Sequence, residues 1–312
     1  MGNGSFWLPP AASSGAPVVD RLFHFIYWTA FVFFVLVVGL MVLFVLRYRR
    51  RPGQKDHGPA PTHNTALELT WTIIPLIVVG VIFYLGFAGF MDISTPPQNA
   101  YEIQVTAMRW KWSFTYPNGL TDEDLHVPAD QPVRLVMTST DVIHGFFVPD
   151  FRLKHDVVPG RYNTVWFRAG KPGTHDIFCT QYCGTGHSEM HAQVIVQNPD
   201  DFQKWLDGAA SALAHASPVE LGERLYHTLG CAQCHSVDGA SSTGPTWKGL
   251  YGSKVPLNGG GSVTADENYV RESILEPNAK VVLGYAAIMP TYQGRVKDPD
   301  VAAIIAYMKT VK

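Results

Sequence analysis

Two long apolar runs near the start of the chain constrain its fold more than any other feature. Residues 22–46 contain no charged side chain, and as a helix they would measure roughly 37 Å, enough to cross the hydrocarbon core of a bilayer. Residues 71–90 form a second run of about 20 residues, close to the shortest length that spans a bilayer. Pro75 lies near its start, where a membrane helix tolerates proline. The sequence therefore predicts a hairpin of two membrane-spanning helices.

Basic residues directly after the first run predict the orientation of this hairpin. They are Arg47, Arg49, Arg50, Arg51 and Lys55. Because positively charged loops stay on the cytoplasmic side, we expect this loop inside a bacterial cell and both termini on the outer, periplasmic face of its membrane. The first run starts too late and is too long for a typical signal peptide, although removal of a short N-terminal segment stays open.

The rest of the sequence has room for further domains and carries little net charge. A length of 312 residues corresponds to about two or three domains. A net charge of −2 with 16% charged residues provides no basic surface, so we expect no nucleic-acid partner. We divide the chain into an N-terminal segment with the hairpin (1–97), a β-rich domain (98–197), a helical linker (198–217) and a C-terminal domain (218–312).

Short strand-like segments follow one another through the β-rich domain. Segments 101–107, 132–139, 162–168 and 192–197 are rich in β-branched and aromatic residues, and Gly, Pro, Asn or Asp bounds each of them. This spacing is typical of a β-sandwich or barrel. The C-terminal domain is rich in glycine and contains two predicted helices, one from residue 218 towards its first cysteine and one over residues 299–309.

All four cysteines fall within two short motifs that suit metal chemistry. The first motif places Cys179, Cys183, His187 and Met190 within twelve residues. Thiolate, imidazole and thioether groups form the soft ligand set that favours copper. A further ligand must come from elsewhere, and His144 lies where a strand end could deliver it. A disulfide between the two cysteines is the alternative, since we expect this domain outside the cytoplasm.

The second motif is Cys231-Ala-Gln-Cys234-His235. This C-x-x-C-H pattern predicts covalent haem attachment, with His235 as the proximal iron ligand. Zinc is disfavoured, because an adjacent Cys and His cannot both ligate easily in one tetrahedron. Haem attachment takes place outside the bacterial cytoplasm and so supports the same orientation of the hairpin. Two redox metal sites on one chain predict a function in electron transfer.

The hairpin, the β-rich domain and the 179–190 loop resemble subunit II of haem-copper cytochrome c oxidase, over residues 20–197. The resemblance implies a cupredoxin barrel that holds a binuclear copper A centre, with two copper ions. Six residues at matching positions would be its ligands: the bridging thiolates of Cys179 and Cys183, one imidazole for each copper from His144 and His187, the thioether of Met190 as a weak ligand and the backbone carbonyl of Gln181.

Three further positions carry roles that the resemblance implies. Many relatives have glutamate where this chain has Gln181, and its carboxylate helps to hold magnesium; a neutral amide is a poorer ligand, so the magnesium site is in question. Trp110 matches the aromatic residue through which electrons enter the copper centre, with core packing as the alternative. Glu68 matches the glutamate at the mouth of a proton path, with a merely solvated carboxylate as the alternative.

The C-terminal domain is similar to class I cytochrome c, an all-α fold. In that family a methionine before a proline is the distal iron ligand, a role that falls to Met289 here, with Met308 as its rival. The combined resemblance is to caa-type oxidases, in which a cytochrome c is fused behind subunit II. It implies that one covalently attached haem c takes electrons from a soluble cytochrome c or similar donor and passes them through copper to subunit I.

This resemblance implies a terminal oxidase that reduces oxygen to water in subunit I and pumps protons, in a lipid bilayer and with a subunit III also present. One alternative function keeps the electron path but changes the catalyst, as the copper A subunit of a nitric oxide reductase. Another is a membrane-anchored copper chaperone, against which the two spans and the haem motif argue.

Overall fold

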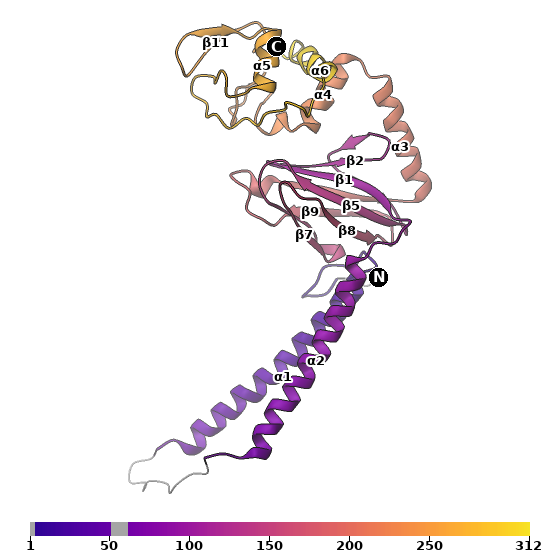
Figure 1. The fold of residues 1–312 in the computed structure, drawn as a ribbon, viewed down its shortest axis with the longest axis vertical. Coiled ribbons are helices and arrows are strands. Elements are labelled where there is room, and N and C mark those ends of the chain that lie inside the picture. The colour runs from indigo at the N-terminus through magenta and orange to yellow at the C-terminus, as the bar shows by residue number, and fades with distance from the viewer. Residues whose placement is uncertain (1–3, 51–61) are drawn as a thin grey trace.

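The computed structural model describes residues 4–50 and 62–312 (Figure 1). Three parts follow one another along the long axis of the molecule: a helical hairpin, a domain of two β-sheets, and a C-terminal domain with three of its own helices. Arg51 and Lys55, two of the basic residues used above for orientation, lie outside the described residues.

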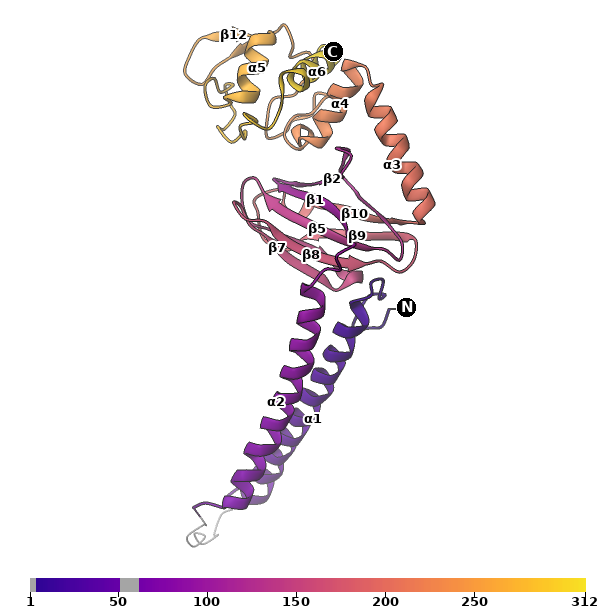
Figure 2. The same cartoon turned by 45° about the vertical axis from the view of Figure 1, so that its right-hand side comes forward.

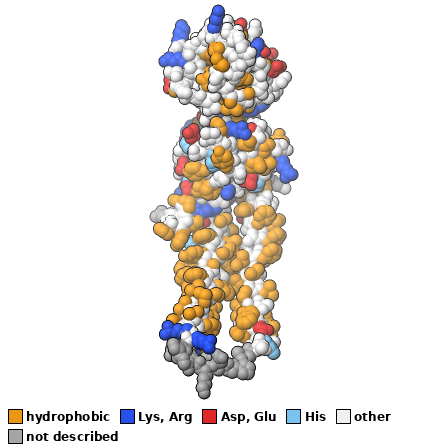
Figure 3. Space-filling view, turned by 90° about the vertical axis from the view of Figure 1, so that its left-hand side faces the viewer, with side chains coloured by type: hydrophobic (Ala, Val, Ile, Leu, Met, Phe, Trp, Pro, Cys, Tyr) orange, Lys and Arg blue, Asp and Glu red, His pale blue; other side chains and the backbone are white. Residues whose placement is uncertain are grey.

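The hairpin consists of α1 (Ala16–Tyr48) and α2 (Thr65–Ser94). Both helices are long and apolar enough to cross a membrane, and their apolar windows are not buried against any described residue. Figure 3 shows hydrophobic side chains over the length of the hairpin and Lys or Arg side chains at its far end. Pro75 lies inside α2 without ending it. The predicted hairpin is confirmed, and both helices extend beyond the apolar runs.

The two helices contact each other near the β-sheet domain. A Cβ atom added at Gly89 would lie 3.4 Å from Val18 Cγ1, and one at Gly86 would lie 3.8 Å from Leu22 Cδ2. Added Cβ atoms at Gly39 and Gly80, further from that domain, would meet no described atom within 4 Å. Figure 1 shows the two helices apart at the end that carries the joining loop, whereas they overlap there in the view of Figure 2, turned by 45°.

The middle domain contains two five-stranded sheets, with strand orders β3-β2-β1-β5-β8 and β4-β10-β9-β6-β7. The strands are β1 (Tyr101–Met108), β2 (Lys111–Thr115), β3 (Thr121–Asp122), β4 (Leu125–Pro128), β5 (Pro132–Ser139), β6 (His144–Val148), β7 (Leu153–Val157), β8 (Asn163–Arg168), β9 (Gly173–Cys179) and β10 (His191–Gln197). Inward side chains such as Val105, Leu135 and Val194 are fully buried, because alternate residues of a strand face the core. This cupredoxin-like fold confirms the predicted β-barrel class.

The helix α3 (Pro199–Ala214) connects the middle domain to the C-terminal one. Trp205 on this helix stacks on the His126 ring, with centroids 3.9 Å apart, and contacts Tyr116 edge-on. Phe202 and Leu206 join the core of the β-sheet domain. The helix is therefore bound along the side of the sheets by an aromatic cluster (Figure 1).

The C-terminal domain is built around α4 (Pro218–Thr228), α5 (Glu267–Leu275) and α6 (Asp298–Met308), with a small hairpin of β11 (Lys254–Pro256) and β12 (Ser262–Thr264). Gly222 lets α4 cross α6 closely, since an added Cβ would lie 2.0 Å from the carbonyl oxygen of Ala303. The helices predicted at the two ends of this domain are present. The sequence prediction missed α5, and it missed the small β-hairpin.

Candidate metal centre and haem cavity

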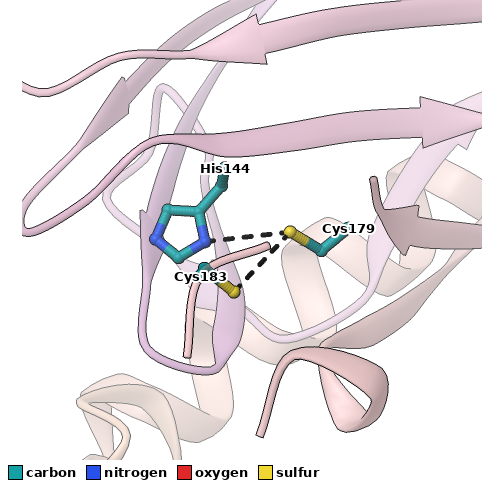
Figure 4. A group of neighbouring side chains, drawn as sticks. All are labelled: His144, Cys179 and Cys183. Atoms are coloured by element: carbon teal, nitrogen blue, oxygen red, sulfur yellow. Dashed lines mark hydrogen bonds between the residues drawn. The ribbon is translucent and has the colours of Figure 1, made fainter. Parts of the chain in front are cut away.

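His144, Cys179 and Cys183 form a compact buried cluster (Figure 4). The sulfur atoms of Cys179 and Cys183 lie 3.8 Å apart, and Nδ1 of His144 lies 3.9 Å from the Cys179 sulfur. All four cysteines of the chain are free thiols. The separation of the two sulfurs is well beyond the ~2.05 Å of a disulfide bond, so the geometry does not favour the alternative of a Cys179–Cys183 disulfide.

Three further predicted ligands surround the same two sulfurs. Nδ1 of His187 lies 3.6 Å from the Cys183 sulfur, and the thioether sulfur of Met190 lies 3.9 Å from it. The carbonyl oxygen of Gln181 lies 3.2 Å from the Cys179 sulfur. The structure thus brings together all six residues that the resemblance implies as copper ligands, from segments as far apart as residues 144 and 190.

The local fold explains how these groups meet. His144 begins β6 and Cys179 ends β9, and the two strands pair with Phe146 opposite Cys179. An added Cβ at Gly145 would lie 2.5 Å from Thr180 Oγ1, so only glycine allows the backbone after His144 to approach the loop so closely. His187 and Met190 follow on a short 3₁₀ turn, η2 (His187–Glu189), before β10.

Asp141 orients His144, although the sequence prediction did not identify it. Nε2 of His144 donates to the Asp141 carboxylate at 2.9 Å, so that Nδ1 faces Cys179. Backbone N–H groups of Arg109 and Val142 also donate to this carboxylate, at 2.8 and 2.6 Å. Burial is the largest effect and opposes protonation of His144, but hydrogen bonds and charge interactions with Asp141 and Cys179 together outweigh it and raise the pKa of this histidine. A carboxylate that fixes a ligand imidazole is a common feature of metal sites.

The two thiols do not ionise alike. Burial raises the pKa of Cys179, but hydrogen bonds with His144, with His187 and with the backbone of Gly145 and Gln181 together outweigh it and lower that pKa to about 6. Burial, together with the negative charge on Cys179, raises the pKa of Cys183 to about 12. Ionisation of one thiol thus hinders ionisation of the other. A positively charged metal would stabilise both thiolates.

The donor set fits a copper pair. Two thiolates, two imidazole nitrogens, a thioether and a carbonyl lie around one small, buried volume. Soft sulfur and imidazole ligands favour copper over hard cations. The carbonyl oxygen of Gln181 lies towards Cys179, and the predicted doubt about a magnesium site stays a prediction.

Trp110 lies against the loop that carries the cysteines. Its indole N–H donates to the carbonyl of Cys183 at 3.3 Å. Added Cβ atoms at Gly184 and Gly186 would lie 3.1 and 2.6 Å from atoms of its ring. The indole thus rests on the glycine backbone of this loop, and any larger residue at position 186 would displace it.

The C-terminal domain contains a cavity of about 150 Å³ that is partly open to solvent. Cys231, Cys234 and His235 line it, the two cysteines on and just after the 3₁₀ turn η3 (Cys231–Gln233). Nδ1 of His235 lies 2.7 Å from the carbonyl oxygen of Pro245, which leaves Nε2 free. Burial lowers the pKa of His235, so the imidazole is neutral, as an iron ligand must be. The cavity and its residues fit a covalently attached haem.

Both methionines considered as the distal ligand line this cavity. Met289 lies on the irregular segment before α6 and is half-buried, whereas Met308 ends α6 and is buried in the domain core. A loop thioether can turn towards an iron atom at little cost, while a core methionine already fills space between helices. This difference favours Met289, in line with the sequence prediction.

Glu68 caps the start of α2. Its carboxylate accepts a hydrogen bond from the backbone N–H of Asn64 at 3.0 Å, while the Asn64 side chain accepts one from the N–H of Leu67 at 3.1 Å. These bonds satisfy donors at a helix N-terminus. The residue therefore has a structural role, and its part in a proton path stays a prediction.

Comparison with known proteins finds family matches in three parts of the chain. It matches three family profiles: "Cytochrome C oxidase subunit II, transmembrane domain" over residues 2–88, "Cytochrome C oxidase subunit II, periplasmic domain" over residues 119–198, and "Cytochrome c" over residues 219–312. A solved structure of the periplasmic domain of subunit II of cytochrome oxidase from Bradyrhizobium japonicum is 31% identical, with a TM-score of 0.36, and the match covers 38% of this chain and 98% of that one.

Two relatives match over most of their length. Cytochrome c oxidase subunit 2 of Thermostichus vulcanus is 31% identical, over 72% of this chain and 88% of the relative. The protein of the same name from Alkalihalophilus pseudofirmus is 30% identical, over 89% of this chain and 82% of the relative. With this identity and coverage, the chain belongs to the cytochrome c oxidase subunit II family and carries a cytochrome c domain at its C-terminal end.

Proposed function

We propose that electrons enter a haem-copper terminal oxidase through this chain. They pass from a soluble donor to one covalently attached haem c, then to a binuclear copper A centre, and then to subunit I, where oxygen is reduced to water with proton translocation. Family membership implies copper A and the cytochrome c domain implies haem c. The observation that carries the proposal is the convergence of two free thiols, two imidazoles and a thioether within 4 Å contacts.

In this proposal Cys179 and Cys183 bridge the two metals, and His144 and His187 each hold one. Met190 and the Gln181 carbonyl complete the set. When bound, the copper pair would supply a carrier that shares one electron between its two ions. The ligands come from paired strands and a glycine-bounded loop, and Asp141 fixes the His144 ring. Such a rigid frame needs little rearrangement between redox states.

At the other end of the path, Cys231 and Cys234 would form the thioether bonds to haem, and His235 and Met289 would hold its iron. The bond from His235 Nδ1 to the Pro245 carbonyl sets the ring orientation. A methionine ligand raises the reduction potential of haem iron, which suits a carrier between a soluble donor and copper.

We also propose how the chain is arranged in the membrane. The basic residues after α1 support a cytoplasmic position for that loop, with both redox domains on the outer face of a bacterial cell membrane. Residues 1–97 anchor the chain beside subunit I, and a subunit III completes the complex. Residues 98–197 form the copper domain, residues 218–312 form the haem domain, and residues 198–217 link the two. Trp110 delivers electrons to the copper, and Glu68 lies at the mouth of a proton path.

Metal content tests this function directly. We expect two copper ions and one haem per full-length chain produced with haem maturation and copper, together with a mixed-valence electron paramagnetic resonance signal. Cys183→Ser should abolish that signal, whereas Tyr182→Phe, in the same loop with 74% of its surface exposed, should retain it. A single, easily exchanged copper would contradict the proposal and favour the copper chaperone.

Gas consumption tests the identity of the catalyst. The complex purified through this chain should consume oxygen in the presence of a reduced soluble cytochrome c. Reduction of nitric oxide without oxygen consumption would contradict the oxidase and favour the nitric oxide reductase.

A further inference from the structure

The cytochrome c domain rests on one turn of the copper domain. We call residues 108–111, which join β1 to β2, the docking turn. An added Cβ at Gly230, just before Cys231, would lie 3.1 Å from Lys111 Cδ and 3.5 Å from the sulfur of Met108. Arg295, in the segment before α6, approaches the same sulfur at 3.8 Å. The turn is therefore enclosed by two segments of the neighbouring domain.

Lys111 is the most unusual residue of this turn, because only 4% of it is exposed. Its ammonium group lies 2.5 Å from the carboxylate of Glu123 in the copper domain and also donates to the backbone carbonyl of His227 in the cytochrome domain. Lysine is almost never fully buried unless it is paired. Here its two partners belong to two different domains, so the full pairing exists only when the domains are together.

Because Lys111 is buried at this interface, its ammonium group needs both partners. Desolvation lowers the pKa of Lys111, against the opposing effect of Glu123. A desolvated charge that loses a partner is costly. A second contact supports the arrangement, since Arg224 on α4 donates to the backbone carbonyl of Thr121 at 2.8 Å. The two contacts involve opposite ends of the β2–β3 segment and thus restrict rotation of one domain on the other.

The docking turn also contacts both cofactor sites. The backbone N–H of Arg109 donates to Asp141, which orients His144, and Arg109 is also among the residues that line the haem cavity. Trp110, the next residue, rests on the loop of Cys183. Any shift of the cytochrome domain on this turn would therefore change the separation between haem cavity and copper cluster.

We propose that Lys111 is a positioning residue that locks the cytochrome c domain on the copper domain in one fixed arrangement, with the cysteine end of the haem cavity against the docking turn. The domain is then a docked module and not a tethered carrier that searches for its acceptor. This inference rests on the proposed electron path, which it deepens by naming the contact that sets its geometry.

Amine labelling of the wild-type chain tests the docked state without any substitution. In the full-length, haem- and copper-loaded protein, the Lys111 amine should react with an acylating reagent at least about tenfold more slowly than Lys204, which has 77% of its side chain exposed. Comparable labelling rates at the two lysines would overturn the fixed arrangement.

Lys111→Met tests the positioning role. Glu123 is 46% exposed, so the substitution leaves its carboxylate in solvent. Electron transfer from haem to copper, followed after rapid reduction of the haem, should slow by about tenfold or more, with the haem potential and the copper spectrum unchanged. Arg224→Met should slow the same step. Lys309→Met removes an ion pair with Glu267 on the outer side of the cytochrome domain and should leave the rate unchanged.

The possible outcomes distinguish a failure of the positioning role from a failure of the proposed electron path. A wild-type chain with no haem-to-copper transfer would contradict the electron path itself. Normal transfer in the wild type, with the same rate in Lys111→Met and Arg224→Met, would overturn the positioning role alone. A lower rate that comes with a changed copper spectrum would also overturn it, since the substitution would then act on the copper site directly.

Discussion

Nε2 of His144 donates to the Asp141 carboxylate at 2.9 Å, and this bond determines which nitrogen of the ring faces Cys179. The same carboxylate accepts two backbone N–H bonds, from Arg109 and from Val142. Its own pKa is lowered, because hydrogen bonds from His144 and these N–H groups outweigh the effect of burial. Asp141 therefore stays ionised and holds the imidazole in one tautomer.

Asp141→Asn should weaken copper binding without removing a ligand. The amide can still accept a bond, but without the negative charge that favours the correct tautomer, so we expect copper affinity to fall by about 10–100-fold. Competition with a chelator of known affinity measures the change. Asp156→Asn, at an exposed position of β7, is the matched control. Equal affinities for both variants would contradict the orienting role.

The copper-free thiols should titrate in two well-separated steps. The pKa of about 6 at Cys179 lies below the ordinary value of a thiol, so its ionisation stabilises the folded chain. That contribution grows as the pH rises from about 6 to about 8.5 and is lost as the pH falls through 6. Thiolate absorbance should show one step near pH 6 and a second at alkaline pH.

Cys179→Ser supplies the control for this titration. It removes the first step and also the negative charge that, after burial, raises the pKa of Cys183. The remaining step should therefore move to lower pH. Two steps that coincide in the unmodified chain would argue against the coupling of the two thiols.

Gly186→Ala should destabilise the copper domain. The new methyl group would lie 2.6 Å from a Trp110 ring atom, and overpacking of this kind costs about 1–3 kcal/mol. Denaturant unfolding followed by loss of copper absorbance measures the cost. Gly208→Ala is the control, because an added Cβ there meets no described atom within 4 Å and should be neutral or stabilising. A neutral Gly186→Ala variant would show that the indole is free to move.

Two methionine variants should separate iron ligation from packing. Met289→Ala should lower the haem potential and remove the sulfur-to-iron charge-transfer band, since the iron loses its thioether ligand. Met308→Ala should keep that band but lower the free energy of unfolding of the domain by about 2–5 kcal/mol, the usual cost of a core cavity. The opposite pattern would assign Met308 as the ligand. Redox titration and denaturant unfolding are the measurements.

Local patterns were sufficient to predict the architecture and to propose the ligand set. The apolar runs predicted both helices of the hairpin, though not their full length. Polar residues such as Asp20 and Asp92 lie within α1 and α2, beyond the apolar stretch that a bilayer requires. The cysteine motifs predicted that four side chains of one short loop would face a common point, because their spacing is itself a property of the sequence.

Other features depend on contacts that no local pattern reveals. The helix α5 is short and carries charged and polar residues, although Asp266, which caps it through the N–H of Tyr269, was a usable signal. Asp141 lies three residues before His144, and a carboxylate beside a candidate ligand histidine was also a signal. Burial of Lys111 was not predictable, because its carbonyl partner at His227 is 116 residues away and lysine is usually exposed.

The separation of the two membrane helices has a consequence for assembly. Near Gly86 and Gly89 they touch, whereas an added Cβ at Gly39 or Gly80 meets no described atom within 4 Å, and Figure 1 shows a wedge between the helices towards the joining loop. In a membrane this wedge cannot stay empty, so acyl chains or the helices of another protein must occupy it. The helical hairpin therefore packs fully only together with lipid or other membrane helices. The copper and cytochrome domains, in contrast, each have a hydrophobic core of their own.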